Sequence, residues 1–231
     1  MPDPSAALRE AAEGLARGQG TVAGMLPWLA DQVRTDAAAG RFAGWATSTA
    51  IDENIASAVI PRAVFDELHL LAGLHGQWPV ANAGLLHVYG YLLSTVATPY
   101  GLKRERWTDG RLAQALGLDI DAFAPWLDSE RTTLHRVLDA ALPILDSPVD
   151  PLLWIDDRTP PGAVVRTVVV SGALVYGVDG TLVTLFPLDT SARGWDQAIL
   201  DGAPRLRYNA VVEGLEPGSI LDGREVRARV G

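Results

Sequence analysis

The sequence contains no cysteine and a single lysine. Its nineteen basic Lys and Arg residues comprise Lys103 and eighteen arginines, in a chain of 231 residues. Without cysteine the chain can form no disulfide bond, bind no metal through a thiolate and use no thiol nucleophile. If codon bias has replaced lysine by arginine almost everywhere, Lys103 either survives by chance on the surface or is kept because an amine is needed.

Several functional signatures are also missing. The glycine-rich fingerprints GxGxxG and GxxxxGK[ST] are absent, as is the nucleophile motif GxSxG, so we expect no nucleotide or redox cofactor. The net charge of −9 comes without a basic stripe, which argues against nucleic acid and against an anionic membrane as partners. The first residues have neither the basic start nor the apolar stretch of a secretory signal, which predicts a cytoplasmic protein.

The patterning that is present changes along the chain from helix to strand. Helical periodicity and capping residues predict helices over residues 4–18, 22–39, 48–60, 61–75, 80–97, 109–117, 119–127 and 129–145. Prolines at 148, 151, 160 and 161 indicate a connector. The sequence therefore predicts three parts: a helical domain over 1–147, a connector over 148–162, and a small β domain over 163–231.

The β part carries a clear hairpin signal. Two alternating runs flank Asp179-Gly180 in ALVYGVDGTLVTLF, and Asp-Gly favours a two-residue turn. A short helix near 194–201 and further strands follow, with a second Asp-Gly at 222–223. Helices first and strands later predict the α+β class, with a small antiparallel sheet or a partly open barrel.

Residues 80–97, VANAGLLHVYGYLLSTVA, form the segment best suited to chemistry. On a helix, apolar residues would cover most of its girth, while His87, Tyr91 and Ser94 would line one stripe at spacings of four and three residues. The segment is shorter than the roughly 20 apolar residues of a membrane span. A buried polar stripe needs partners, so we expect it to face a polar neighbour, trapped water or a pocket.

Three interpretations of His87 remain open. It is a core histidine bonded to a neighbouring helix, a general acid/base at the wall of a cleft, or a metal ligand. The metal alternative would gather Asp66, His69 and His75 from the preceding helix with His87, although their spacing matches no standard metal motif. We therefore expect no metal at this segment.

Lys103 begins the densest positive cluster, KRER at 103–106. The simpler interpretation is a solvated face that stabilises the end of the preceding helix. The functional interpretation is that Lys103 or Arg104 binds a carboxylate or phosphate of a substrate. Glu53, which also suits a helix cap, would orient His87 if its helix crossed residues 80–97.

Two hypotheses of function follow. The first is an enzyme that acts on a small, anionic metabolite by general acid/base chemistry, as a hydrolase, lyase or isomerase, with His87, Tyr91 and Ser94 as catalytic residues and Lys103, Arg104 and Glu53 binding substrate. The second is a non-catalytic binding or assembly module, in which the polar stripe holds helices together and tryptophans contact a protein partner. A homo-oligomer is compatible with both.

Overall fold

The computed structural model describes residues 3–52, 55–98, 101–127, 130–147, 152–156, 163–170 and 172–187. Its helices are α1 (Pro4–Ala16), α2 (Val22–Met25), α3 (Pro27–Ala38), the 3₁₀ turn η1 (Arg41–Gly44), α4 (Arg62–Ala72), the π-helix η2 (Leu85–Gly90), α5 (Glu105–Thr108), α6 (Arg111–Ala115) and α7 (Thr133–Leu145). Its strands are β1 (Thr47–Thr49), β2 (Ile51–Asp52), β3 (Ser57–Ala58), β4 (Val80–Asn82), β5 (Ala97–Thr98), β6 (Gly101–Leu102), β7 (Leu152–Asp156), β8 (Ala163–Val170), β9 (Ala173–Val178) and β10 (Thr181–Pro187).

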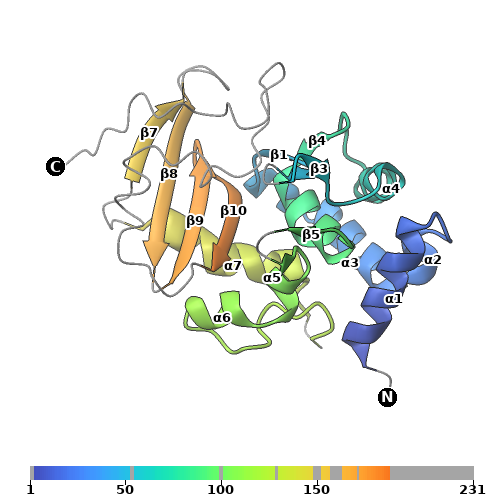
Figure 1. Ribbon diagram of the computed structural model, residues 1–231. Coiled ribbons are helices and arrows are strands. Elements are labelled where there is room, and N and C mark those ends of the chain that lie inside the picture. Colours follow the sequence, from blue (N-terminus) through green and yellow to red (C-terminus); the bar gives the residue numbers. More distant parts are fainter. Residues whose placement is uncertain are drawn as a thin grey trace.

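The predicted α+β class is confirmed. Helices dominate the first two-thirds, and β7 to β10 form an antiparallel sheet in the order β10-β9-β8-β7 (Figure 1). Among the described strands this sheet is open, not closed into a barrel. The predicted hairpin is present: Asp179 and Gly180 have φ of 48° and 77°, as a turn of two left-handed residues requires.

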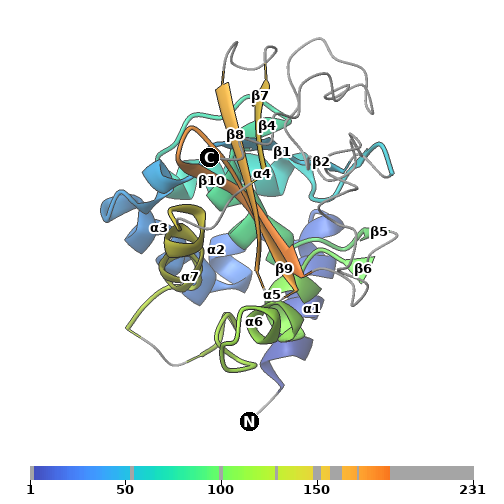
Figure 2. The same cartoon turned by 90° about the vertical axis from the view of Figure 1, so that its left-hand side faces the viewer.

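The β part and the helical part share one continuous apolar core. Leu8 of α1, Val88 of η2 and Leu185 of β10 all belong to it. Helix α7 packs on β8, β9 and β10 and also contacts α3 and η1, whereas α6 contacts β10 directly (Figures 1 and 2). Strand β7 occupies part of the segment 148–162 that the sequence presents as a connector.

The contact between α7 and the sheet depends on a glycine. A Cβ atom at Gly177 would lie 2.6 Å from Leu145 Cδ2 and 2.8 Å from Thr181 O. Real Cβ atoms do not approach other atoms so closely, so a side chain at this position must displace the Leu145 side chain and the backbone of Thr181.

We expect Gly177→Ala to lower the free energy of unfolding by about 1–3 kcal/mol, as overpacking of a tight core does. Urea denaturation would measure the loss. In a double-mutant cycle, Leu145→Ala should relieve part of it, so that the two losses sum to more than the loss in the double variant. A Gly177→Ala protein as stable as the wild type would contradict this account of the contact.

Three helix predictions were wrong. The described residues of the range 48–60 contribute to β1, β2 and β3 instead of a helix, because β1 pairs with the distant β4 from Thr47↔Asn82 to Thr49↔Val80. For the same reason the helix predicted over 80–97 begins only after β4. Residues 119–127 form turns, because Arg136 takes the carbonyl groups of Ala122 (2.5 Å) and Ala124 (3.0 Å), which a helix would use internally.

None of the helices in the described ranges combines the length and the apolarity needed to cross a bilayer. The helix and strands predicted beyond residue 187, including the turn at 222–223, lie outside the described residues.

Candidate functional site

The candidate site lies on the π-helix η2. Its entry is fixed by Asn82, whose Oδ1 accepts from Leu85 N (3.2 Å) while its Nδ2 donates to Phe42 O (2.8 Å). The glycines beside the polar stripe allow close packing: a Cβ at Gly84 would lie 2.7 Å from the Trp45 ring. The Trp45 ring therefore fills the space beside Gly84. A π-helix such as η2 holds an extra residue per turn and often occurs at functional sites.

His87 is held by two neighbours. Its Nε2 is 2.8 Å from Ser48 Oγ on β1, and its ring stacks on Tyr91 with centroids 4.8 Å apart. The residue is 1% exposed, and Tyr91 and Ser94 are equally buried. The sequence placed Ser48 at the start of a helix predicted over 48–60, so this contact was not foreseen, and only the pairing of β1 with β4 reveals it.

The imidazole of His87 is neutral at pH 7. Burial lowers its pKa well below 6.5, and the positive charges of Arg106 and Lys103 lower it further. The backbone of Val183 partly opposes this shift, although no hydrogen bond of standard geometry joins Nδ1 to a described group. A neutral imidazole has one nitrogen that can accept a proton, which is the form that a general base requires.

The sheet reaches His87 through a β-bulge in β10. The register of β10 against β9 shifts between Leu182 and Thr184, so Val183 is the extra residue. A bulge leaves the backbone of its extra residue outside the regular ladder, and bulges are frequent next to active sites. The β part therefore contributes to the surroundings of His87, which the sequence could not reveal.

Lys103 and Arg106 place two positive charges beside the ring of Tyr91. Lys103 Nζ is 2.5 Å from Asp52 Oδ2, and this ion pair is buried, with 7% and 0% of the side chains exposed. Arg106 donates to Thr184 Oγ1 (2.9 Å). Lys103 Nζ and Arg106 Cζ lie 5.4 and 5.0 Å from the centroid of the Tyr91 ring, within cation–π range. The solvated-face interpretation of Lys103 is therefore wrong.

The other predicted site residues are distributed as follows. Ser94 Oγ is buried and has no hydrogen-bond partner among the described residues. Arg104 is also buried, but the charges that influence it are those of Glu13, Arg9 and Glu105 and not the groups around His87. Glu53 lies outside the described residues, so its predicted role is not addressed by the structure. Arg106, Asp52 and Ser48 are additional residues that the sequence analysis did not select.

The residues of the metal alternative have separate environments. Asp66 pairs with Arg62 (3.6 Å) on the exposed face of α4, and His75 is exposed. His69 is buried, where its Nδ1 lies 2.7 Å from Phe65 O and burial lowers its pKa. The described part of the chain contains no group of three or more His, Asp or Glu residues that could hold a metal ion.

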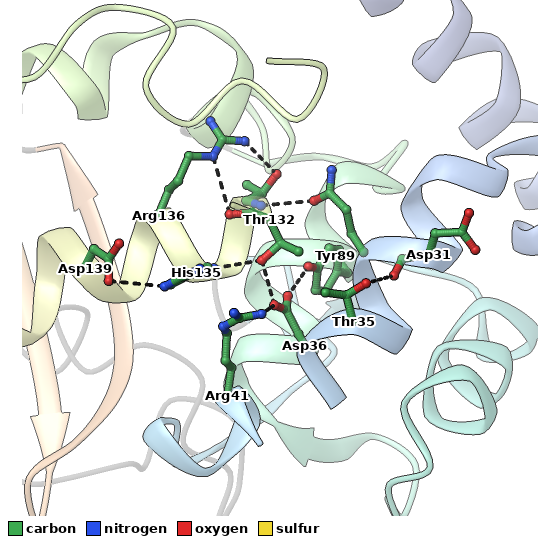
Figure 3. Close-up of polar contacts among 11 residues, drawn as sticks. Asp31, Thr35, Asp36, Arg41, Tyr89, Thr132, His135, Arg136 and Asp139 are labelled. Atoms are coloured by element: carbon green, nitrogen blue, oxygen red, sulfur yellow. Dashed lines mark hydrogen bonds and ion pairs between the residues drawn. The ribbon is translucent and has the colours of Figure 1, made fainter. Parts of the chain in front are cut away.

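A second buried polar cluster surrounds Asp36 of α3 (Figure 3). Its carboxylate accepts from the Tyr89 hydroxyl, from Thr132 Oγ1 (2.6 Å) and from Arg41 Nη1 (2.8 Å). Desolvation, followed by the negative charge of Asp36, raises the pKa of Tyr89 well above 10, so its hydroxyl remains a donor. Because Asp36 is completely buried and fully engaged, this cluster joins α3, η1, η2 and α7 and is structural.

Comparison of the chain with protein-family models, with curated proteins and with solved structures gave no match. No related protein therefore indicates the chemistry of the site, which follows from its geometry. That geometry consists of a neutral imidazole held by a serine hydroxyl, a tyrosine ring stacked on it, and two cations beside that ring. Such a group of residues can move a proton to or from a bound anion.

Proposed function

We propose that this chain is a cytoplasmic enzyme that acts on a small anionic metabolite by acid/base catalysis, without a nucleotide or redox cofactor. The observation that carries the proposal is the Ser48–His87 hydrogen bond (2.8 Å) directly beside the charges of Lys103 and Arg106. A catalytic base needs an orienting partner and a nearby group that binds the substrate, and this arrangement supplies both.

The proposed proton transfer follows from the charges. In the free protein, burial and then the two cations lower the pKa of His87 and keep its imidazole neutral, so that it can act as a proton acceptor. A substrate carboxylate or phosphate beside Lys103 and Arg106 would offset their charge, which makes protonation of the imidazole easier when substrate is bound. The proton can then be returned to the product, as hydrolases, lyases and isomerases all require.

The remaining roles belong to the same proposal. Tyr91 supports the imidazole by stacking, and Ser94 offers a buried hydroxyl without a described partner, which suits contact with a polar substrate group. Lys103, which is ion-paired with Asp52, contributes positive charge that favours an anion at this site.

A specific observation also favours the second hypothesis, a non-catalytic binding or assembly module. His87, Tyr91 and Ser94 are each at most 1% exposed, as expected of a polar stripe that holds elements together. In that case His87 contributes only to stability, and replacing it removes a buried hydrogen bond at a cost of about 1–3 kcal/mol.

His87→Gln tests the two hypotheses. Thermal-shift screening of small carboxylates and phosphate esters would first find a ligand, and turnover would then be followed with it. We expect His87→Gln to keep the ligand-induced shift and to reduce turnover by about 10²–10⁴-fold, because the amide can still contact Ser48 but cannot accept a proton. His75→Gln, at an exposed histidine, is the control and should keep wild-type turnover.

The pH dependence of stability gives an additional readout. Because the pKa of His87 is lower when folded than when unfolded, the unfolded chain takes up a proton first, and wild-type stability should decrease as pH falls below about 6.5. His87→Gln should remove this part of the decrease. If no compound in the panel binds or reacts, and His87→Gln only lowers stability, the assembly hypothesis replaces the enzyme.

A further inference from the structure

Arg104 is a buried cation with unused donors. The residue is 8% exposed, yet neither its Nε nor its Nη1 makes a hydrogen bond to any described group. Guanidinium nitrogens donate hydrogen bonds and cannot accept them, and the group stays charged at any physiological pH. A buried donor left without an acceptor is costly, and a buried charge is more so. The structure therefore leaves this site short of an acceptor.

The nearest acidic groups do not supply that acceptor. Glu13 of α1 and Glu105 of α5 are close enough to favour the charged form of Arg104, but no ion pair joins either of them to it. The Glu105 carboxylate instead accepts from the backbone of Leu102 (2.9 Å). Arg9 of α1 adds a second positive charge nearby, which opposes that of Arg104. Arg104 is therefore under the influence of a second arginine and of two carboxylates, neither of which is ion-paired with it.

The neighbouring cations differ from Arg104. Lys103 is paired with Asp52, and Arg106 donates to Thr184. The charges of those two residues act on His87, whereas the charges that act on Arg104 are those of Glu13 and Arg9 on α1 and of Glu105. Lys103 and Arg106 therefore contribute charge to the site around His87, whereas Arg104 belongs to a different part of the molecule.

We propose that Arg104 is the centre of a second anion site, where α1 meets the start of α5, which binds a phosphate or carboxylate group. The oxyanion accepts from Nε and Nη1 of Arg104, and the charge of Arg9 strengthens its binding. The site is independent of catalysis at His87, so it does not rest on the proposed function. It is suited to an effector or to a charged group distant from the reacting atoms.

Inorganic phosphate and acetate are the two probes, each titrated at constant ionic strength in chloride and followed by thermal shift and calorimetry. The wild type should show a saturable rise in melting temperature with at least one probe, and the two arms distinguish phosphate from carboxylate. Arg104→Met should abolish this rise. Arg34→Met, at an arginine with 53% of its side chain exposed, and His87→Gln should both retain it.

The melting temperatures measured without added phosphate or acetate give the more decisive test. If Arg104 lacks a protein partner, Arg104→Met should melt at or above the wild-type temperature in buffer without phosphate or acetate, because a buried unpaired charge has been removed. If Arg104 is instead a structural residue, the variant melts lower, and the proposal is overturned. It is overturned equally by a wild type without a saturable response, or by a response that survives in Arg104→Met.

Two milder variants test the donor geometry and the supporting charge of the site separately. Arg104→Lys retains the charge with a different donor geometry, and we expect its dissociation constant for the probe to rise at least about tenfold. Arg9→Gln should raise it several-fold, because it removes the supporting charge. Unchanged affinity in both variants would rule the site out.

Discussion

Asp36→Ala should lower the free energy of unfolding by about 3–5 kcal/mol, the loss typical of breaking a buried ion pair by removing one partner. Asp36 is 0% exposed and accepts from Tyr89, Thr132 and Arg41 at once. Truncation leaves a hydroxyl, a second hydroxyl and a guanidinium without their acceptor. All three come from different elements, so the loss is shared by η1, η2 and α7.

Chemical denaturation with urea measures this loss, and a matched control is available on the same helix. Asp31 pairs with Arg34, but both side chains are largely exposed, at 73% and 53%. Asp31→Ala should therefore change stability by less than about 0.5 kcal/mol. If the two alanine variants lost similar amounts, the carboxylate of Asp36 would not be the hub of the network.

The tyrosine of this network adds an alkaline signature. The pKa of Tyr89 is higher in the folded protein than its ordinary value of 10.0, so its contribution to stability is complete below pH 10 and is lost as pH rises beyond it. Tyr89→Phe should remove that alkaline dependence. In a cycle with Asp36→Asn, the two losses should sum to more than the loss in the double variant, since both remove the same bond.

Lys103→Met is expected to be nearly as damaging, again by about 3–5 kcal/mol. The substitution keeps an apolar stem of similar length but removes the ammonium group 2.5 Å from the buried Asp52 carboxylate. Urea denaturation would measure this loss.

The double variant Asp52→Asn/Lys103→Met separates pairing from packing. Replacing both charged groups leaves no buried charge uncompensated, so most of the loss should be recovered. Arg111→Met provides a control, since the Arg111 side chain is 65% exposed in its pair with Asp109 and should affect stability little. A double variant as unstable as Lys103→Met would show that the lysine acts through its packing and not through its charge.

Local patterns predicted the parts of the fold that depend on neighbouring residues. Asp179-Gly180 specified its hairpin through turn chemistry, and Gly117 ended its helical segment with a positive φ of 72°. Spacing of four residues likewise predicted that His87 and Tyr91 would lie together, and their rings do stack even though the helix is of the π type.

Features that depend on distant partners were not predictable from local patterns. Thr47–Thr49 becomes a strand only because Val80–Asn82 pairs with it, and that pairing brings Ser48 to His87. The burial of Lys103 depends on Asp52, from another hairpin, and on the aromatic ring of Tyr91. A run of charged residues is usually exposed to solvent, and nothing within residues 103–106 indicates that this run is buried.

The backbone hydrogen bond between Ala46 and Leu182 limits where the chain can be cut into fragments that keep their structure. Ala46 N donates to Leu182 O (2.9 Å), and Trp45 forms a bridge with Leu182 next to the bulge at Val183. A fragment that ends at residue 147 would lose these backbone contacts and also β10, which packs beside His87. Such contacts between remote segments also delay folding, because a long loop must close first. During synthesis the imidazole therefore acquires its final environment only after β10 has left the ribosome.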